Sequence, residues 1–180
     1  MSPTPRERRI GRLGVLVVSA ALVAITSLAS CAARGLAFRI DHRLEILSPS
    51  DRVEVRLPFE LRWRARDFPV GAATIGGNGN YFAVFVDRAP MGPNQPFRAL
   101  ADTDCKRTRG CPDEQWLADH QIYLTTSTSL TITSLPDVLP GNTRPGVKEP
   151  HEITIVLVNA TDQRIGESAF TIEFFFVRDR

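Results

Sequence analysis

Histidine and methionine are scarce in this chain of 180 residues, which contains three histidines and two methionines. His42, His120 and His151 lie far apart, and none belongs to a Gly-x-Ser-x-Gly or similar motif, so no hydrolase triad is predicted. The methionines are Met1 and Met91, which gives no support for a copper carrier with methionine and histidine ligands. We therefore expect no catalytic residue, no cofactor and no metal site, and a protein that is not an enzyme.

Carboxylates are the remaining candidates for a metal site. Asp102 and Asp104, together with Asp113 and Glu114, could gather around Ca²⁺ in an exported loop. Basic residues interleave with them, however, and the spacing matches no calcium-binding loop. We interpret these side chains as solvated charges that offset one another.

A basic stripe suited to nucleic acid is also missing from most of the chain. The formal net charge is +2, but four arginines and one glutamate precede Cys31. Subtracting them from the 22 basic and 20 acidic residues leaves 18 against 19, so residues 31–180 carry a net charge near −1. We therefore expect no nucleic-acid partner.

What the chain does have is an N-terminal segment typical of exported proteins. Residues 1–12 are basic, residues 13–28 form an apolar run, and Leu28-Ala29-Ser30-Cys31 follows. This pattern resembles the signal peptide and lipobox of bacterial lipoproteins. The resemblance implies that residues 1–30 are removed, that Cys31 is acylated (palmitate), and that residues 31–43 form a tether. It also implies a lipid anchor on the extracytoplasmic side of the cell membrane or the outer membrane.

Two other interpretations of this segment stay open. Residues 13–33 carry no charge and are just long enough to span a bilayer of about 30 Å as an uncleaved helix. An ordinary secretory signal would instead be cleaved and leave no anchor. All three interpretations predict export.

Cys105 and Cys111 are the two cysteines that remain. In an exported domain they favour a disulfide, and closing so short a loop would stabilise the fold by about 2 kcal/mol on the chain-entropy model. A metal site or a redox pair is the less favoured alternative. The nearest imidazole, His120, is isolated, and no Cys-x-x-Cys motif is present.

From Leu44 onward, short strands separated by turn residues predict an all-β fold. Apolar and charged residues alternate in 53–57 and 59–64, which indicates strands with one buried face. Further strands are predicted at 81–86, 121–125, 129–135, 152–158 and 169–177, and a short helix at 112–119. About seven strands with little helix predict a two-sheet sandwich.

The start of this region resembles the first strands of immunoglobulin-like and fibronectin type III-like domains. The matching sequences are Leu-Glu-Ile-Leu-Ser-Pro at residues 44–49 and Pro-Phe-Glu-Leu-Arg-Trp at residues 58–63, in which Trp63 takes the position of a tryptophan typical of the second strand. The resemblance implies an immunoglobulin-like sandwich over residues 44–178. It departs from the family in lacking the usual corner tyrosine and in an insertion of about thirty residues, stapled by the predicted disulfide. Because this scaffold serves many functions, it implies none.

Three of the predicted strands are apolar on both faces, although a sheet with one wet side should carry a polar outer face. We therefore predict that the outer face is covered, either by the insertion at residues 87–120 or by a protein partner. The candidate partner face consists of Phe82, Val84, Val86, Val156, Val158, Phe175 and Val177.

A second candidate site is the Gly/Asn loop at residues 76–80, where Asn78, Asn80 and Tyr81 could bind a small ligand. The favoured function is a non-catalytic protein-interaction module that a lipid holds at the cell envelope. The alternatives are a carbohydrate- or small-ligand-binding accessory module and an enzyme with no recognisable motif.

Overall fold

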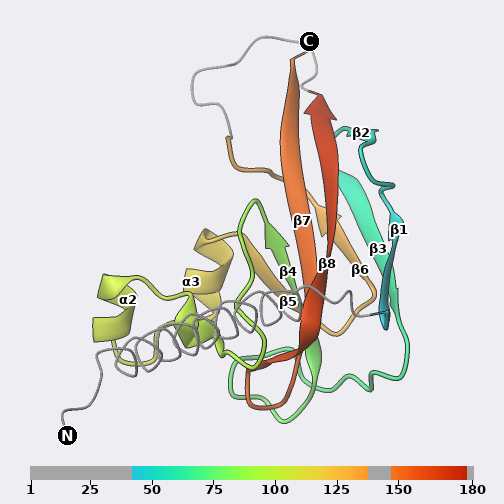
Figure 1. Ribbon diagram of the computed structural model, residues 1–180. Helices are drawn as coiled ribbons and strands as arrows, with labels where there is room; N and C mark the ends of the chain where they lie inside the picture. Colours follow the sequence, from blue (N-terminus) through green and yellow to red (C-terminus); the bar gives the residue numbers. More distant parts are fainter. Residues whose placement is uncertain (1–41, 138–146, 178–180) are drawn as a thin grey trace, which may run out of the picture. The chain divides into compact units, whose positions relative to one another are not determined.

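The computed structural model describes residues 42–137 and 147–177 (Figure 1). The predicted signal peptide, Cys31 and most of the predicted tether lie outside these residues. No helix in the described part of the chain is both long enough and apolar enough to cross a bilayer. The strands are β1 (Leu44–Ser48), β2 (Glu54–Val55), β3 (Phe59–Ala65), β4 (Tyr81–Val86), β5 (Ile122–Thr125), β6 (Ser129–Ile132), β7 (Lys148–Val158) and β8 (Arg164–Val177). The helices are the 3-10 turn η2 (Phe97–Ala99), α2 (Thr103–Arg107) and α3 (Glu114–Asp119).

These strands form two sheets, as an all-β sandwich requires. One sheet has the order β1-β3-β6 and the other the order β2-β8-β7-β4-β5. The short β2 runs parallel to β8, whereas the other pairs are antiparallel. The strands β8, β7 and β4 lie side by side, as the seventh, sixth and third strands do in an immunoglobulin-like sandwich. The predicted fold class is confirmed.

The space between the sheets is filled by alternate residues of the strands. In β3, Leu61 and Trp63 are buried while Glu60 and Arg62 are exposed, as the alternation predicts. The Trp63 ring meets Phe82 of β4 edge to face, with 5.5 Å between ring centroids. The contact joins the two sheets through the largest side chain of the core.

The outer face of the larger sheet is covered by the insertion. Tyr81, Ala83 and Phe85 of β4 form a second buried cluster with side chains that the insertion supplies. Phe97 stacks against both Tyr81 and Phe85, with 6.5 Å between ring centroids in each case. Val156 and Val158 of β7 belong to the same cluster, together with Met91 and Leu117. The insertion therefore covers the outer faces of β4 and β7, which the sequence predicted to be apolar on both sides.

Most of the residues predicted to form the candidate partner face are buried, so the prediction was wrong for them. Phe82, Val84 and Val86 lie between the sheets, because cross-strand register pairs Phe82 with Leu157 and Val84 with Ile155, which face inward. A difference of one residue in register exchanges the two faces of a strand. Val156 and Val158 do face outward but lie beneath the insertion. Only Phe175 and Val177 are partly exposed.

Two capped helices and a disulfide hold the insertion together. Asp102 accepts a hydrogen bond from the Cys105 backbone N–H at the start of α2, and Asp113 accepts one from Trp116 at the start of α3. Cys105 and Cys111 form the predicted disulfide, with 5.2 Å between their Cα atoms. Two of the carboxylates interpreted as solvated charges are thus helix caps. Because Asp113 is the cap of α3, this helix begins at Glu114 and not at the predicted residue 112.

Candidate functional site

The Gly/Asn loop does not present the ligand-binding cluster that the sequence predicted. Tyr81 is fully buried, and its hydroxyl donates a hydrogen bond of 2.6 Å to Oδ1 of Asp162. The Asn80 amide donates to the Pro69 carbonyl, whereas Asn78 is exposed. A tyrosine inside the core cannot stack on a sugar, so the prediction that included Tyr81 was wrong.

Asp162 also explains why the Gly/Asn loop folds onto the sandwich. The other carboxylate oxygen of Asp162 accepts from the backbone N–H of Gly76, which has a φ of 71° that favours glycine. Burial, followed by the hydrogen bond and charge of Asp162, raises the pKa of Tyr81 well above its ordinary value. The Gly/Asn loop is therefore held to the turn between β7 and β8 by the contact between Gly76 and Asp162.

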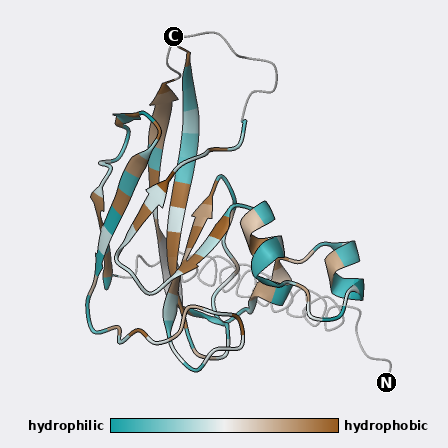
Figure 2. Ribbon diagram, turned by 180° about the vertical axis from the view of Figure 1, so that it is seen from behind, coloured by the Kyte–Doolittle hydropathy of each residue, from teal (hydrophilic) through white to brown (hydrophobic). Residues whose placement is uncertain are grey.

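A pocket opens where the long β7–β8 hairpin extends past the end of β4. In Figure 1, both strands continue beyond β4, which pairs only with residues 153–158 of β7. Figure 2 shows the change along β7, whose first residues are hydrophilic and whose later residues are mostly hydrophobic. The pocket has a volume of about 450 Å³, which falls in the range of small-ligand sites. We call it the acidic pocket; it is lined by Asp87, Arg88, Ala89, Pro150, His151, Glu152, Glu173, Phe174 and Phe175.

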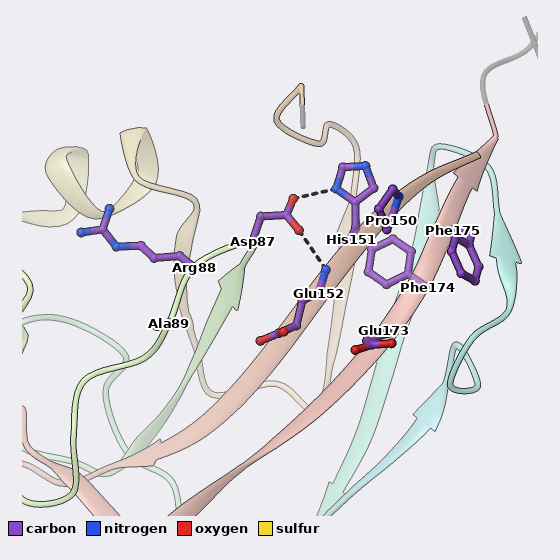
Figure 3. A pocket seen from close by; sticks show the side chains of 9 residues that line it. All are labelled: Asp87, Arg88, Ala89, Pro150, His151, Glu152, Glu173, Phe174 and Phe175. Atoms are coloured by element: carbon purple, nitrogen blue, oxygen red, sulfur yellow. Dashed lines mark hydrogen bonds and ion pairs between the residues drawn. The ribbon is translucent and has the colours of Figure 1, made fainter. Parts of the chain in front are cut away.

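Asp87 anchors one side of the acidic pocket. It follows β4 directly and has a φ of 52°, a left-handed conformation that aspartate tolerates. Its Oδ1 accepts from the Glu152 backbone N–H at 2.8 Å, and its Oδ2 lies 2.6 Å from Nδ1 of His151 (Figure 3). Both carboxylate oxygens are therefore occupied within the chain, so Asp87 acts as a positioning group.

His151 is held firmly by this contact. Its residue exposure is 3%, and its ring stacks on Phe174 with 5.7 Å between centroids. Because a carboxylate only accepts hydrogen bonds, Nδ1 carries the proton toward Asp87. Nε2 is buried and has no hydrogen-bond partner. A buried polar atom left without a hydrogen-bond partner is energetically costly.

Two further carboxylates lie on the outer face of the hairpin. Glu152 and Glu173 are direct cross-strand partners on β7 and β8, and both are exposed. Like charges in such a position repel one another. Glu152 accepts a hydrogen bond of 3.3 Å from Thr154, while Glu173 lies 3.8 Å from Nε of the exposed Arg52. The repulsion between the two is only partly relieved by the chain itself.

The one basic residue of the acidic pocket turns away from this pair. Arg88 donates to the Leu100 carbonyl at 3.3 Å and places its guanidinium over the Trp116 ring, 5.4 Å from the centroid. Figure 3 shows it pointing away from Glu152 and Glu173. Pro150 and Phe175 supply an apolar wall near the glutamates, so the accessible side of the pocket combines negative charge with apolar surface.

Sequence reasoning found only one residue of this pocket as a candidate, Phe175. Asp87 and His151 are separated by 64 residues in the chain, and no local pattern links them. A usable signal existed in Glu152 and Glu173, which are charged residues directly beside the apolar runs at residues 153–158 and 174–177. Among the described residues, no group of three or more His, Cys, Asp or Glu side chains is placed to hold a metal ion.

No protein-family model, no curated protein and no solved structure matches this chain.

Proposed function

We propose that this chain is a membrane-anchored extracytoplasmic lipoprotein that acts as a non-catalytic protein-interaction module and docks its partner at the acidic pocket. The lipobox at Cys31 supports the anchor, and the Cys105–Cys111 disulfide is in keeping with an oxidising compartment outside the cytoplasm. The anchor places the partner at the membrane or the cell envelope.

The observation that carries the binding role is the contrast along the outer face of the hairpin. Toward the β7 C-terminus this face is sealed by the insertion, since Val156 and Val158 are buried. Around the acidic pocket, by contrast, Pro150 and Glu152 are exposed and Phe175 is partly exposed. An accessible pocket bordered by aromatic and charged side chains supports a partner contact.

Site-specific photocrosslinking in the native membranes tests this proposal. The full chain carries p-benzoylphenylalanine in place of Phe175, and a control variant carries it in place of Leu47, which is 48% exposed on β1. We expect a discrete adduct with another polypeptide from position 175, lost when Glu152→Arg is added, and no such adduct from position 47. Equal labelling from both positions, or none from 175, would reject a partner at the pocket.

A small-ligand-binding module is the second candidate, because the pocket volume of about 450 Å³ suits a small molecule. It predicts that no polypeptide adduct forms at position 175 while low-molecular-weight material from the envelope still protects the pocket. Thermal unfolding of the full chain with and without such an extract separates the two.

A further inference from the structure

We infer that the outer face of the smaller sheet rests on an anionic bilayer, the one that holds the chain's own lipid anchor. This inference rests on the proposed function, because it takes the lipid on Cys31 as given, and it adds the orientation in which the domain meets the membrane. Three features point to it: the charge of this face, the place where the tether joins the fold, and the position of the acidic pocket.

The outer face of the smaller sheet carries more cations than anions. Along β3, the exposed Arg62 and Arg64 alternate with the buried Leu61 and Trp63, so both arginines point away from the core. Arg66 follows the strand and is also exposed. We call this surface the arginine face; its charged residues are Glu45, Glu60, Arg62, Arg64 and Arg66. Three arginines against two glutamates give it a positive excess.

The ion pairs on the arginine face leave its guanidinium groups accessible to phosphate. Arg64 and Arg66 share the single carboxylate of Glu45, and Nη2 of Arg66 is 3.9 Å from that oxygen. These side chains are 49–65% exposed, and exposed ion pairs of this kind are weak. Because a guanidinium binds phosphate through two parallel hydrogen bonds, lipid phosphates compete well with the one carboxylate.

The tether joins the fold beside these arginines. β1 begins at Leu44, which pairs with Ala65, the residue between Arg64 and Arg66. The Arg66 backbone N–H donates to the Arg43 carbonyl at 2.9 Å, so the chain enters along the same edge. A tether of about a dozen residues that ends here keeps the arginine face within reach of the headgroups. A weak contact is then met at a high effective concentration.

The acidic pocket lies on the other sheet. Its exposed Glu152 and Glu173 stand on β7 and β8, whereas the arginine face belongs to β1 and β3, and the outer faces of two packed sheets point in opposite directions. An anionic surface attracts the arginine face and repels the two glutamates, so both effects favour one orientation. Since residues 31–180 carry a net charge near −1, this separation of charge and not the total sets the orientation. The pocket then opens away from the bilayer, where a partner can reach it.

Quenching of a fluorophore by a headgroup nitroxide lipid tests this inference. The full chain with its lipid is inserted into vesicles of phosphatidylcholine and phosphatidylglycerol. The fluorophore is attached through Thr131→Cys, opposite Glu60 on β6, or through Ala118→Cys on the exposed side of α3 as the control. We expect quenching about fivefold stronger at position 131, since one excess cation near an anionic surface changes the docked population by about that factor. Vesicles of phosphatidylcholine alone, or high salt, should abolish the difference.

Two triple variants assign the contact to the arginine face. Replacing Arg62, Arg64 and Arg66 together by glutamine should bring quenching at position 131 down to that at position 118. The matched control replaces three exposed arginines of the insertion by glutamine and should keep the difference; these are Arg98, Arg107 and Arg109.

The outcomes separate this inference from the proposed function. Equal quenching at the two positions in anionic vesicles, or a difference that persists without phosphatidylglycerol, would overturn the inference and leave the anchor and the partner at the acidic pocket standing. A wild-type chain with no lipid mass on Cys31, or with no adduct from position 175, would instead reject the proposed function.

Discussion

The hydroxyl of Tyr81, on β4, donates to Asp162 in the turn between β7 and β8, and its ionisation should set the alkaline limit of stability. Because its pKa is raised in the folded protein, the unfolded chain releases this proton first, at about pH 10. The stabilising contribution of Tyr81 is therefore complete below about pH 10 and is lost as the pH rises further. Burial also raises the pKa of Tyr123, the other tyrosine of the chain. Ionisation of Tyr123 therefore also contributes to the loss of folding stability at alkaline pH.

Tyr81→Phe tests this directly. Near neutral pH the variant should lose about 1 kcal/mol, the value of one hydrogen bond, because Asp162 keeps only its contact with Gly76. Between pH 10 and 11 the wild-type protein should lose stability more steeply than the variant, by up to about 1.4 kcal/mol per pH unit for one proton. Urea unfolding of the full chain at pH 8, 10 and 11 measures both effects. Parallel pH profiles would contradict the assignment.

The facing glutamates of the hairpin should cost stability in the free protein. Glu152→Gln removes one of the two charges, while the new amide oxygen can still accept from Thr154. We expect a gain of about 0.5 kcal/mol at low salt that shrinks as salt screens the repulsion. Glu60→Gln is the matched control, because Glu60 pairs with Thr131 and faces no like charge. A loss of stability in Glu152→Gln relative to this control would show that the pair is not repulsive.

At the scale of elements, the insertion should act as part of the core rather than as an added loop. Val156→Glu places a carboxylate beneath it, where the side chain is 1% exposed, so the loss should reach about 3 kcal/mol or more. Val156→Ala separates lost packing from buried charge and should cost less. Phe175 lies outside the part of the sheet that the insertion covers and is only partly buried, so Phe175→Glu should cost less, about 1 kcal/mol. Similar losses for both glutamate variants, measured by thermal unfolding, would mean that the insertion does not seal the sheet.

The disulfide should stabilise the insertion locally. Replacing Cys105 and Cys111 together by serine removes a closed loop worth about 2 kcal/mol on the chain-entropy model. We expect amide exchange to accelerate first in residues 103–119, because these include both capped helices. Wild-type protein treated with a reductant serves as the control. Acceleration confined to the strands, with no change in the helices, would contradict this expectation.

Strands with a clear local signal could be predicted from the sequence, and elements that depend on distant partners could not. The strand 81–86 was predicted with its observed ends, since a Gly/Asn loop precedes it and Asp87 terminates it. β7, by contrast, begins at Lys148 rather than Glu152, because Lys-Glu-Pro-His pairs with the end of β8 despite its weak strand propensity. The acidic pocket arises from this extension. Its composition depends on register between strands, which the pattern of any single strand leaves open.

At the scale of the whole molecule, the distance from the membrane limits what the domain can bind. β1 begins at Leu44, so a chain acylated at Cys31 has about a dozen residues between lipid and fold. Fully extended, they span no more than about 45 Å. With a net charge near −1 for residues 31–180, the domain as a whole gains little attraction to an anionic bilayer. On the proposed function, the partner at the acidic pocket must then itself be held near the membrane.

Cys31→Ala tests the anchor on which this geometry depends. The wild-type protein should fractionate with membranes and carry a lipid mass on its N-terminal cysteine, because a diacylated residue partitions into a bilayer. The variant should lose that mass and enter the soluble fraction once processed, with the thermal stability of its sandwich unchanged. Membrane attachment that survives Cys31→Ala would favour an uncleaved helix over residues 13–33, and a soluble wild-type protein would favour an ordinary secretory signal. In the soluble variant, the Phe175 adduct should also weaken, since a tethered partner is then met only by free diffusion.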